Sequence, residues 1–170
     1  MIVFSPDEKY YTPEIRGGFR IAEMTKRYMA VQLKVLSEID SVCEAHGIRW
    51  FAEFGTLLGA VRHHGFIPWD DDMDIAMFRD DYKTFLKYAV EELPSTYRVF
   101  DVHSNSEYDD PIGRVVNNGR IQFDPAYLAE FCGCPYTAGI DIFLLDGIYD
   151  DPVAEKDRCD RAKLINEAYG

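Results

Sequence analysis

Hydrophobic residues recur along the chain at two different spacings, which predicts both helices and strands. From residue 20 to residue 46 they recur every three or four positions, the spacing of one helix face. This stripe comprises Met24, Tyr28, Val31, Val35, Ile39 and Val42. A second stripe predicts a helix over residues 81–93, with Asp80 as its N-cap and Pro94 at its end. Its expected buried face comprises Tyr82, Phe85, Leu86, Ala89, Val90 and Leu93.

Shorter helical segments follow from local signals. Helices are predicted over residues 57–64 and 125–131, and a last helix begins at Pro152 after Asp151, its expected N-cap. Residues 1–19 are rich in Tyr, Pro and Gly and predict an irregular lead-in.

Apolar runs of strand length predict the sheet. They cover residues 48–54, 72–78, 97–103 and 139–145. The turn signal Asn117-Asn118-Gly119 predicts a hairpin whose strands begin at Arg114 and Arg120.

These elements together predict an α+β fold, a small mixed sheet flanked by helices. The strand over residues 72–78 should lie beside the strand over 139–145. The helices over residues 20–46 and 81–93 should pack on one face of that sheet. Because no repeat, low-complexity tract or linker divides the chain, we expect one domain over residues 1–170.

Composition narrows the class of protein. The 170 residues are 47% apolar and 14% aromatic, which is enough for a packed core. The net charge of −12 argues against a nucleic-acid partner, because a phosphate-backbone binder needs a basic face. An acidic protein can still bind a nucleotide through a metal ion. No apolar run reaches about 18 residues and no signal-peptide pattern is present, so we expect a cytoplasmic protein without a membrane span.

The cysteines offer a weak alternative metal site. Cys43, Cys132, Cys134 and Cys159 lack the paired C-x₂-C spacing of a zinc site. We expect reduced, partly buried thiols, with a metal role for Cys132 and Cys134 as the alternative.

Acidic residues inside apolar strands are the main chemical signal. Asp72 and Asp74 alternate along the predicted strand and therefore project from one face, with the apolar residues between them on the other. Two such carboxylates repel unless a cation lies between them, and Mg²⁺ prefers carboxylate oxygen. Asp141 lies between Ile140 and Ile142, where an unpaired carboxylate is costly, so the same cation would be its partner.

Several further residues are candidates for binding phosphate or nucleotide. Gly55 and Thr56 form a strand-to-helix turn whose free N–H groups can bind phosphate, or Thr56 is an ordinary N-cap. Arg62 either neutralises a phosphate or is a surface arginine, and Arg114 is a weaker candidate of the same kind. Trp69 either stacks on a base or a trimethylammonium group, or packs in the core.

The run GTLLGAVRHHGFIPWDDDMDIAM, followed later by GIDIFLLDG, resembles the LicD family. That family includes bacterial phosphocholine transferases, has fukutin-related proteins as distant relatives, and is similar to the nucleotidyltransferase-fold superfamily. The resemblance extends over roughly residues 33–145. Members often continue well beyond the third acidic strand, so we expect this chain to be short at its C-terminus relative to them.

The resemblance assigns roles to the candidates. It implies that Gly55 and Thr56 form the phosphate turn and that Asp72, Asp74 and Asp141 hold Mg²⁺ or Mn²⁺. Asp141 would also accept a proton from the attacking hydroxyl. Asp70 and Asp71 would orient these ligands, or are solvated charges.

The resemblance also implies an activity. This is Mg²⁺-dependent transfer of a phospho-alcohol group, phosphocholine first, from a CDP-linked donor to a hydroxyl of a glycan or lipid-linked sugar. Aromatic walls for a choline head are available from Phe66, Trp69, Tyr108 and Tyr136. One alternative is a nucleotidyltransferase that uses an NTP on a sugar, drug or protein and releases pyrophosphate rather than CMP. Another is a non-catalytic nucleotide-binding module.

Overall fold

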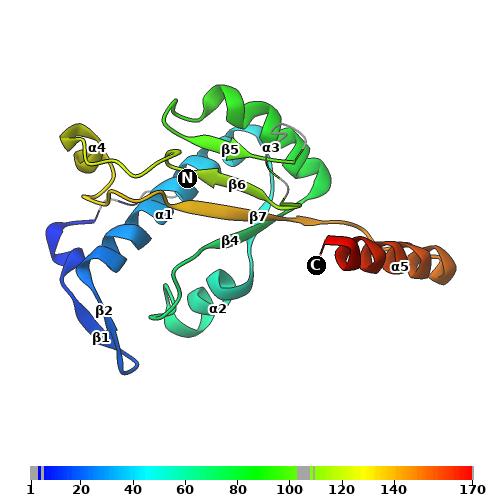
Figure 1. Ribbon diagram of the computed structural model, residues 1–170, viewed down its shortest axis with the longest axis horizontal. Coiled ribbons are helices and arrows are strands. Elements are labelled where there is room, and N and C mark those ends of the chain that lie inside the picture. Colours follow the sequence, from blue (N-terminus) through cyan, green and yellow to red (C-terminus); the bar gives the residue numbers. More distant parts are fainter. Residues whose placement is uncertain (1–3, 5, 103–107, 109, 170) are drawn as a thin grey trace.

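A five-stranded mixed sheet forms the centre of the protein, as the computed structural model of residues 4, 6–102, 108 and 110–169 shows (Figure 1). In spatial order its strands are β3 (Trp50–Ala52), β4 (Asp74–Phe78), β7 (Gly139–Leu145), β6 (Gly113–Val116) and β5 (Arg98–Phe100). β4 and β7 run parallel, and the other neighbouring pairs are antiparallel. The predicted α+β class and the predicted pairing of the two acid-bearing strands are therefore confirmed.

Helices and a small hairpin surround this sheet. The helices are α1 (Glu23–His46), α2 (Phe54–His63), α3 (Arg79–Glu92), α4 (Pro125–Glu130) and α5 (Pro152–Tyr169). In Figure 1, α5 extends away from the sheet. Within the described residues, no helix combines the length and the apolar character needed to cross a membrane.

The predicted irregular lead-in is wrong for much of its length. A 3₁₀ turn, η1 (Glu8–Tyr11), is followed by the antiparallel strands β1 (Glu14–Arg16) and β2 (Phe19–Ile21). Gly17 and Gly18 join them with φ of 58° and 80°. Two consecutive residues with positive φ match the twist of a tight hairpin, and glycine reaches that conformation without strain.

The core lies on the face of the sheet that α1 and α3 cover. Ile75 and Met77 of β4 and Ile140 and Ile142 of β7 are fully buried there, in one cluster with the apolar stripes of both helices. This confirms that α1 and α3 share one face. It also leaves the alternate residues of β4 and β7, including Asp74 and Asp141, to the opposite face.

Two residues expected in the core are exposed. Met24 is 39% exposed because α1 begins only at Glu23, so Met24 stands in its first turn. Val90 is 75% exposed. It comes directly after Ala89, which lies on the buried face of α3, so its own side chain points away from that face. The N-cap of α3 is also Phe78 rather than Asp80.

The predicted hairpin at Asn117-Asn118-Gly119 is wrong, because β6 pairs with β5 and β7 instead. Both asparagines are buried, and their Nδ2 groups donate to the Tyr127 hydroxyl at 2.6 and 2.7 Å. Asn117 Oδ1 accepts from the Ala138 N–H at 2.9 Å. The side chains therefore fix a tertiary contact rather than a hairpin turn.

Candidate active site

The start of α2 is joined to the start of β4. Thr56 Oγ1 accepts a hydrogen bond from the Asp74 N–H at 2.8 Å, and the Glu53 N–H donates to the Asp74 carbonyl at 3.1 Å. Phe54, with φ of 42°, turns the chain sharply between β3 and α2, a conformation that is strained for a residue with a side chain. Thr56 therefore stands in the first turn of α2 and is not the N-cap, a position that Glu53 occupies.

Gly55 allows a carboxylate to approach this first turn. A Cβ atom at Gly55 would lie 2.3 Å from Asp70 Oδ2, which is closer than any real contact. The absence of a side chain thus places the Asp70 carboxylate beside the N-terminus of α2. That end of a helix favours negative charge, so Gly55 shapes the site by lacking a side chain.

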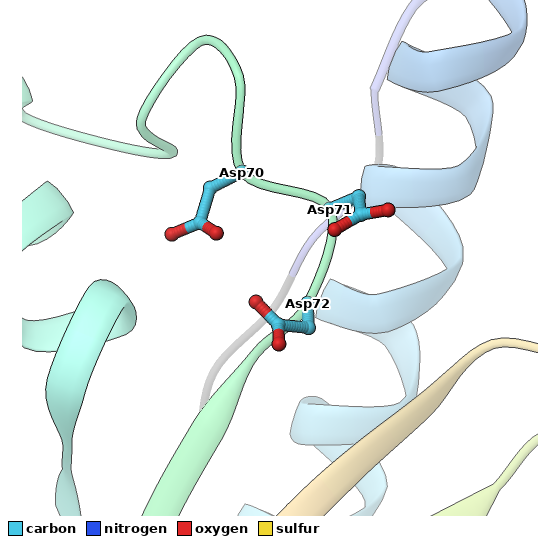
Figure 2. Close-up of side chains that lie close together, drawn as sticks. All are labelled: Asp70, Asp71 and Asp72. Atoms are coloured by element: carbon cyan, nitrogen blue, oxygen red, sulfur yellow. The ribbon is translucent and has the colours of Figure 1, made fainter.

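Three consecutive aspartates gather in the loop that leads into β4 (Figure 2). β4 begins at Asp74, two residues later than predicted, so Asp72 belongs to this loop. Asp70, Asp71 and Asp72 each offer one carboxylate oxygen, and these atoms lie within 4.8 Å of one another. Figure 2 shows the carboxylates of Asp70 and Asp72 extending to the same side of the loop. This acidic loop, residues 70–72, could hold a metal ion.

A row of charged residues crosses the face of the sheet opposite to the core. Asp74 lies in register with Asp141 on β7, and Asp141 lies in register with Arg114 on β6. The Arg114 guanidinium donates to both oxygens of Asp141, the Nη2 contact being 2.7 Å. The partner of Asp141 in the structure is thus the Arg114 side chain, whereas the sequence analysis expected a metal ion. That Asp141 also binds a metal stays a prediction.

The carboxylates of the acidic loop and of this row repel one another. Burial and the charges of Asp72 and Asp141 raise the pKa of Asp74 to about 6, although Arg114 opposes the shift. Burial and the neighbouring Asp72 likewise raise the pKa of Asp70. A bound cation would relieve this repulsion, and a set of carboxylate oxygens suits the hard ions Mg²⁺ and Mn²⁺.

The remaining charged and aromatic candidates lie at the far end of α2. Trp69 is 57% exposed, so core packing is excluded, and its ring contacts Phe19 and His63 edge to face. Arg62 is exposed, and its Nε donates to His63 Nε2 at 2.9 Å. A role for Arg62 in binding phosphate, and for Trp69 in stacking on a base, stays a prediction.

The cysteines take no part in the acidic loop. All four are free thiols, and Cys43 and Cys134 are buried, as expected. Among the described residues, the one grouping of potential metal ligands contains only the three aspartates. The alternative metal role of Cys132 and Cys134 therefore gains no support.

A cavity of about 430 Å³ adjoins the acidic loop. α1, α2, β3 and the β1–β2 hairpin contribute its walls, which include Gly55, Thr56, Asp70 and Asp72. Most of the lining is apolar and includes Ile21, Met29, Leu33, Leu36, Ile67 and Met73, with the aromatic rings of Tyr10, Trp50 and Phe66. The size is typical of a small-molecule site, and sequence analysis did not find it, because its walls come from segments far apart in the chain.

Comparison with known proteins decides the family. Residues 47–121 match the LicD/FKTN/FKRP nucleotidyltransferase domain, which includes both the start of α2 and the acidic loop. The chain belongs to this family.

Two named relatives are transferases of phosphorylated alcohols. The chain is 32% identical to the lipopolysaccharide cholinephosphotransferase LicD of Haemophilus influenzae over 123 residues, which is 72% of this chain and 44% of that protein. It is 50% identical to the ribitol 5-phosphate transferase FKRP of Homo sapiens over 43 residues, 25% of this chain and 9% of that protein. The chain thus spans less than half the length of these relatives.

The raised pKa of Asp74 predicts a specific pH dependence of stability in the absence of metal. Folded Asp74 keeps its proton up to about pH 6, whereas the unfolded chain loses it near 3.9. The folded state then binds more protons in this range, so this group lowers the free energy of unfolding as pH rises from about 4 to 6. We expect Asp74→Asn in EDTA to melt at a higher temperature than wild type at pH 7, with the difference vanishing at pH 4.

Asp146→Asn is the matched control, since Arg79 binds Asp146 at 2.5 and 2.6 Å and lowers its pKa. It should destabilise the protein at pH 7, the opposite sign. Equal melting temperatures of wild type and Asp74→Asn at pH 7 would contradict the raised pKa that burial and the neighbouring carboxylates give Asp74.

Proposed function

We propose that this domain transfers a phosphocholine group from a CDP-linked donor to a hydroxyl of a glycan or lipid-linked sugar. The observation that carries the proposal is the acidic loop, fixed beside the first turn of α2 and the row of Asp74, Asp141 and Arg114. A site rich in carboxylates binds a diphosphate only through cations, which is the requirement of phosphoryl transfer. The names of the relatives support a phospho-alcohol as the group transferred.

The chain supplies oxygen ligands for the cation. Asp72 would hold Mg²⁺ or Mn²⁺ together with Asp70 from the same loop, and Asp74 of β4 and Asp141 of β7 are the proposed further ligands. Such an ion neutralises the charge of the diphosphate and of the departing CMP. The N–H groups of Gly55 and Thr56 stand in the first turn of α2, where a helix has no acceptors of its own, and can donate to phosphate oxygens.

Asp141 is the proposed proton acceptor. The acceptor oxygen bonds to the phosphorus of the phosphocholine group, the bond from that phosphorus to the bridging oxygen breaks, and CMP leaves. The hydroxyl proton passes to the Asp141 carboxylate. Arg114 donates to each oxygen of this carboxylate, which orients it and still leaves lone pairs for a proton.

The cavity supports choline over a polyol as the transferred alcohol. Its mainly aromatic and apolar walls suit a trimethylammonium group, and the acids that line it, Glu14, Asp70 and Asp72, outnumber the bases Arg16 and Lys26. Of the four aromatic residues expected to form these walls, only Phe66 lines the cavity; Tyr10 and Trp50 replace Trp69, Tyr108 and Tyr136.

A second candidate function is transfer of a nucleotidyl group from an NTP, because the matching family model is that of a nucleotidyltransferase domain. The two differ in the product released. Incubation with CDP-choline, CDP-ribitol, CDP-glycerol or NTPs, each with and without Mg²⁺, should yield CMP from CDP-choline. Pyrophosphate from an NTP, with no CMP from any CDP-alcohol, would replace the first function by the second.

Removal of one carboxylate tests the assignment of the cation site. We expect Asp74→Asn to lower CMP release from CDP-choline at least about a hundredfold, because a charge-stabilising group is lost. Circular dichroism should show an intact fold, and Asp146→Asn should retain wild-type turnover. If Asp74→Asn is fully active, Asp74 does not hold the cation.

The cavity wall tests the choice of alcohol. Phe66→Leu should weaken CDP-choline binding by about 1–2 kcal/mol, the scale of a desolvated cation–π contact, and CDP-ribitol binding by less. Calorimetry with Mg²⁺ present measures both. Trp69→Ala is the comparison, because Trp69 is exposed and does not line the cavity, so it should affect both donors equally. Equal losses for both donors in Phe66→Leu would place the choline group elsewhere.

A further inference from the structure

Gln32 is a polar residue in the buried stripe of α1. It is 1% exposed, and the neighbouring Val31 and Val35 are fully buried core residues. Its Nε2 donates to the Asp71 carbonyl at 3.0 Å, while its Oε1 has no partner among the described residues. A buried unpaired oxygen lowers the free energy of unfolding, so an apolar residue would stabilise the helix packing better. The Gln32 amide is therefore not explained by packing of the core, and its role is sought in its contact with the acidic loop.

The side chain of Gln32 donates its hydrogen bond to the middle residue of the acidic loop. The loop is tied at its ends by the Asp70 N–H, which donates to the Ile67 carbonyl at 3.0 Å, and by the contact between Asp74 and Thr56. Gln32 connects the segment between these ends to α1. A backbone carbonyl held by a buried amide cannot shift without leaving a second buried polar atom unpaired.

Repulsion among the like charges of the loop gives the hydrogen bond between Gln32 and the Asp71 carbonyl a structural role. The ligand oxygens of the three aspartates lie within 4.8 Å, so their repulsion favours any loop movement that spreads them. We propose that Gln32 is a positioning residue that holds the acidic loop in the shape that binds a cation. The proposal rests on the proposed function, because it assigns cation binding to this loop.

The test compares two substitutions to methionine on the same helix. Gln32→Met keeps the length of the side chain and removes the donor. Ile39→Met is the control, since Ile39 is fully buried on α1 and does not line the cavity. The first readout needs no metal: hydrogen–deuterium exchange of the peptide over residues 70–74 in EDTA. We expect exchange about tenfold faster than wild type in Gln32→Met and unchanged in Ile39→Met.

The second readout is Mn²⁺ affinity, followed by electron paramagnetic resonance. Loss of a residue that orients ligands costs about 10–100-fold in metal affinity, and we expect this for Gln32→Met alone. Unchanged exchange and affinity in Gln32→Met, or equal losses in both variants, would overturn the positioning role. If wild type binds no Mn²⁺, the proposed function loses its cation and Gln32 its role in binding one; exchange then decides only whether it restrains the loop.

A wild-type measurement decides the matter if Gln32→Met does not fold. The side-chain amide resonances of Gln32 should shift when Mg²⁺ is titrated in, because the carbonyl that the amide contacts belongs to the loop that would bind the ion. Resonances that stay still at saturating Mg²⁺ would overturn the proposal.

Discussion

Repulsion among carboxylates at the start of β4 is the constraint that the surrounding structure has to meet. Burial and the charges of Asp72, Asp141 and Asp70 together raise the pKa of Asp74 to about 6. Arg114, which pairs with Asp141, balances only part of this charge. The backbone around these carboxylates is also held in place, by the Gln32 amide of α1 and the Thr56 hydroxyl of α2.

The core and the charged row depend on the same strand register. Because side chains alternate along a strand, the register that buries Ile75 and Ile142 also sets Asp74 beside Asp141 on the other face. A slip of one residue would bury the acids and expose the core, so burial of apolar surface enforces the geometry of the charges. The free energy of unfolding of the core and the placement of the acids are therefore linked.

The sequence predicted those parts of the fold that depend on local pattern. Alternation around Asp74 and the apolar run around Asp141 were sufficient to place β4 and β7 side by side. The parts that it missed depend on contacts between distant segments. The Asn-Gly signal failed because Asn117 and Asn118 bond to Tyr127, a tertiary contact that outweighs the local turn preference.

The candidate site, like the fold, was only partly predictable from the sequence. The acidic residues were visible in the sequence because a carboxylate inside an apolar run is costly. The pairing of Arg114 with Asp141 depends on the register between β6 and β7, and no local pattern reports that register. The closeness of Gly55 to Asp70 and the walls of the cavity likewise exist only after the chain has folded.

The apolar cavity and the acidic loop reinforce each other electrostatically. They share Gly55, Thr56, Asp70 and Asp72, so two carboxylates of the loop line a cavity whose other walls are mainly apolar. Charges interact more strongly where water is excluded, which increases both their repulsion and their attraction for a cation. Apolar walls and an acidic loop can therefore act together in one site. Such walls would strengthen the attraction between a small number of carboxylates and a cationic group.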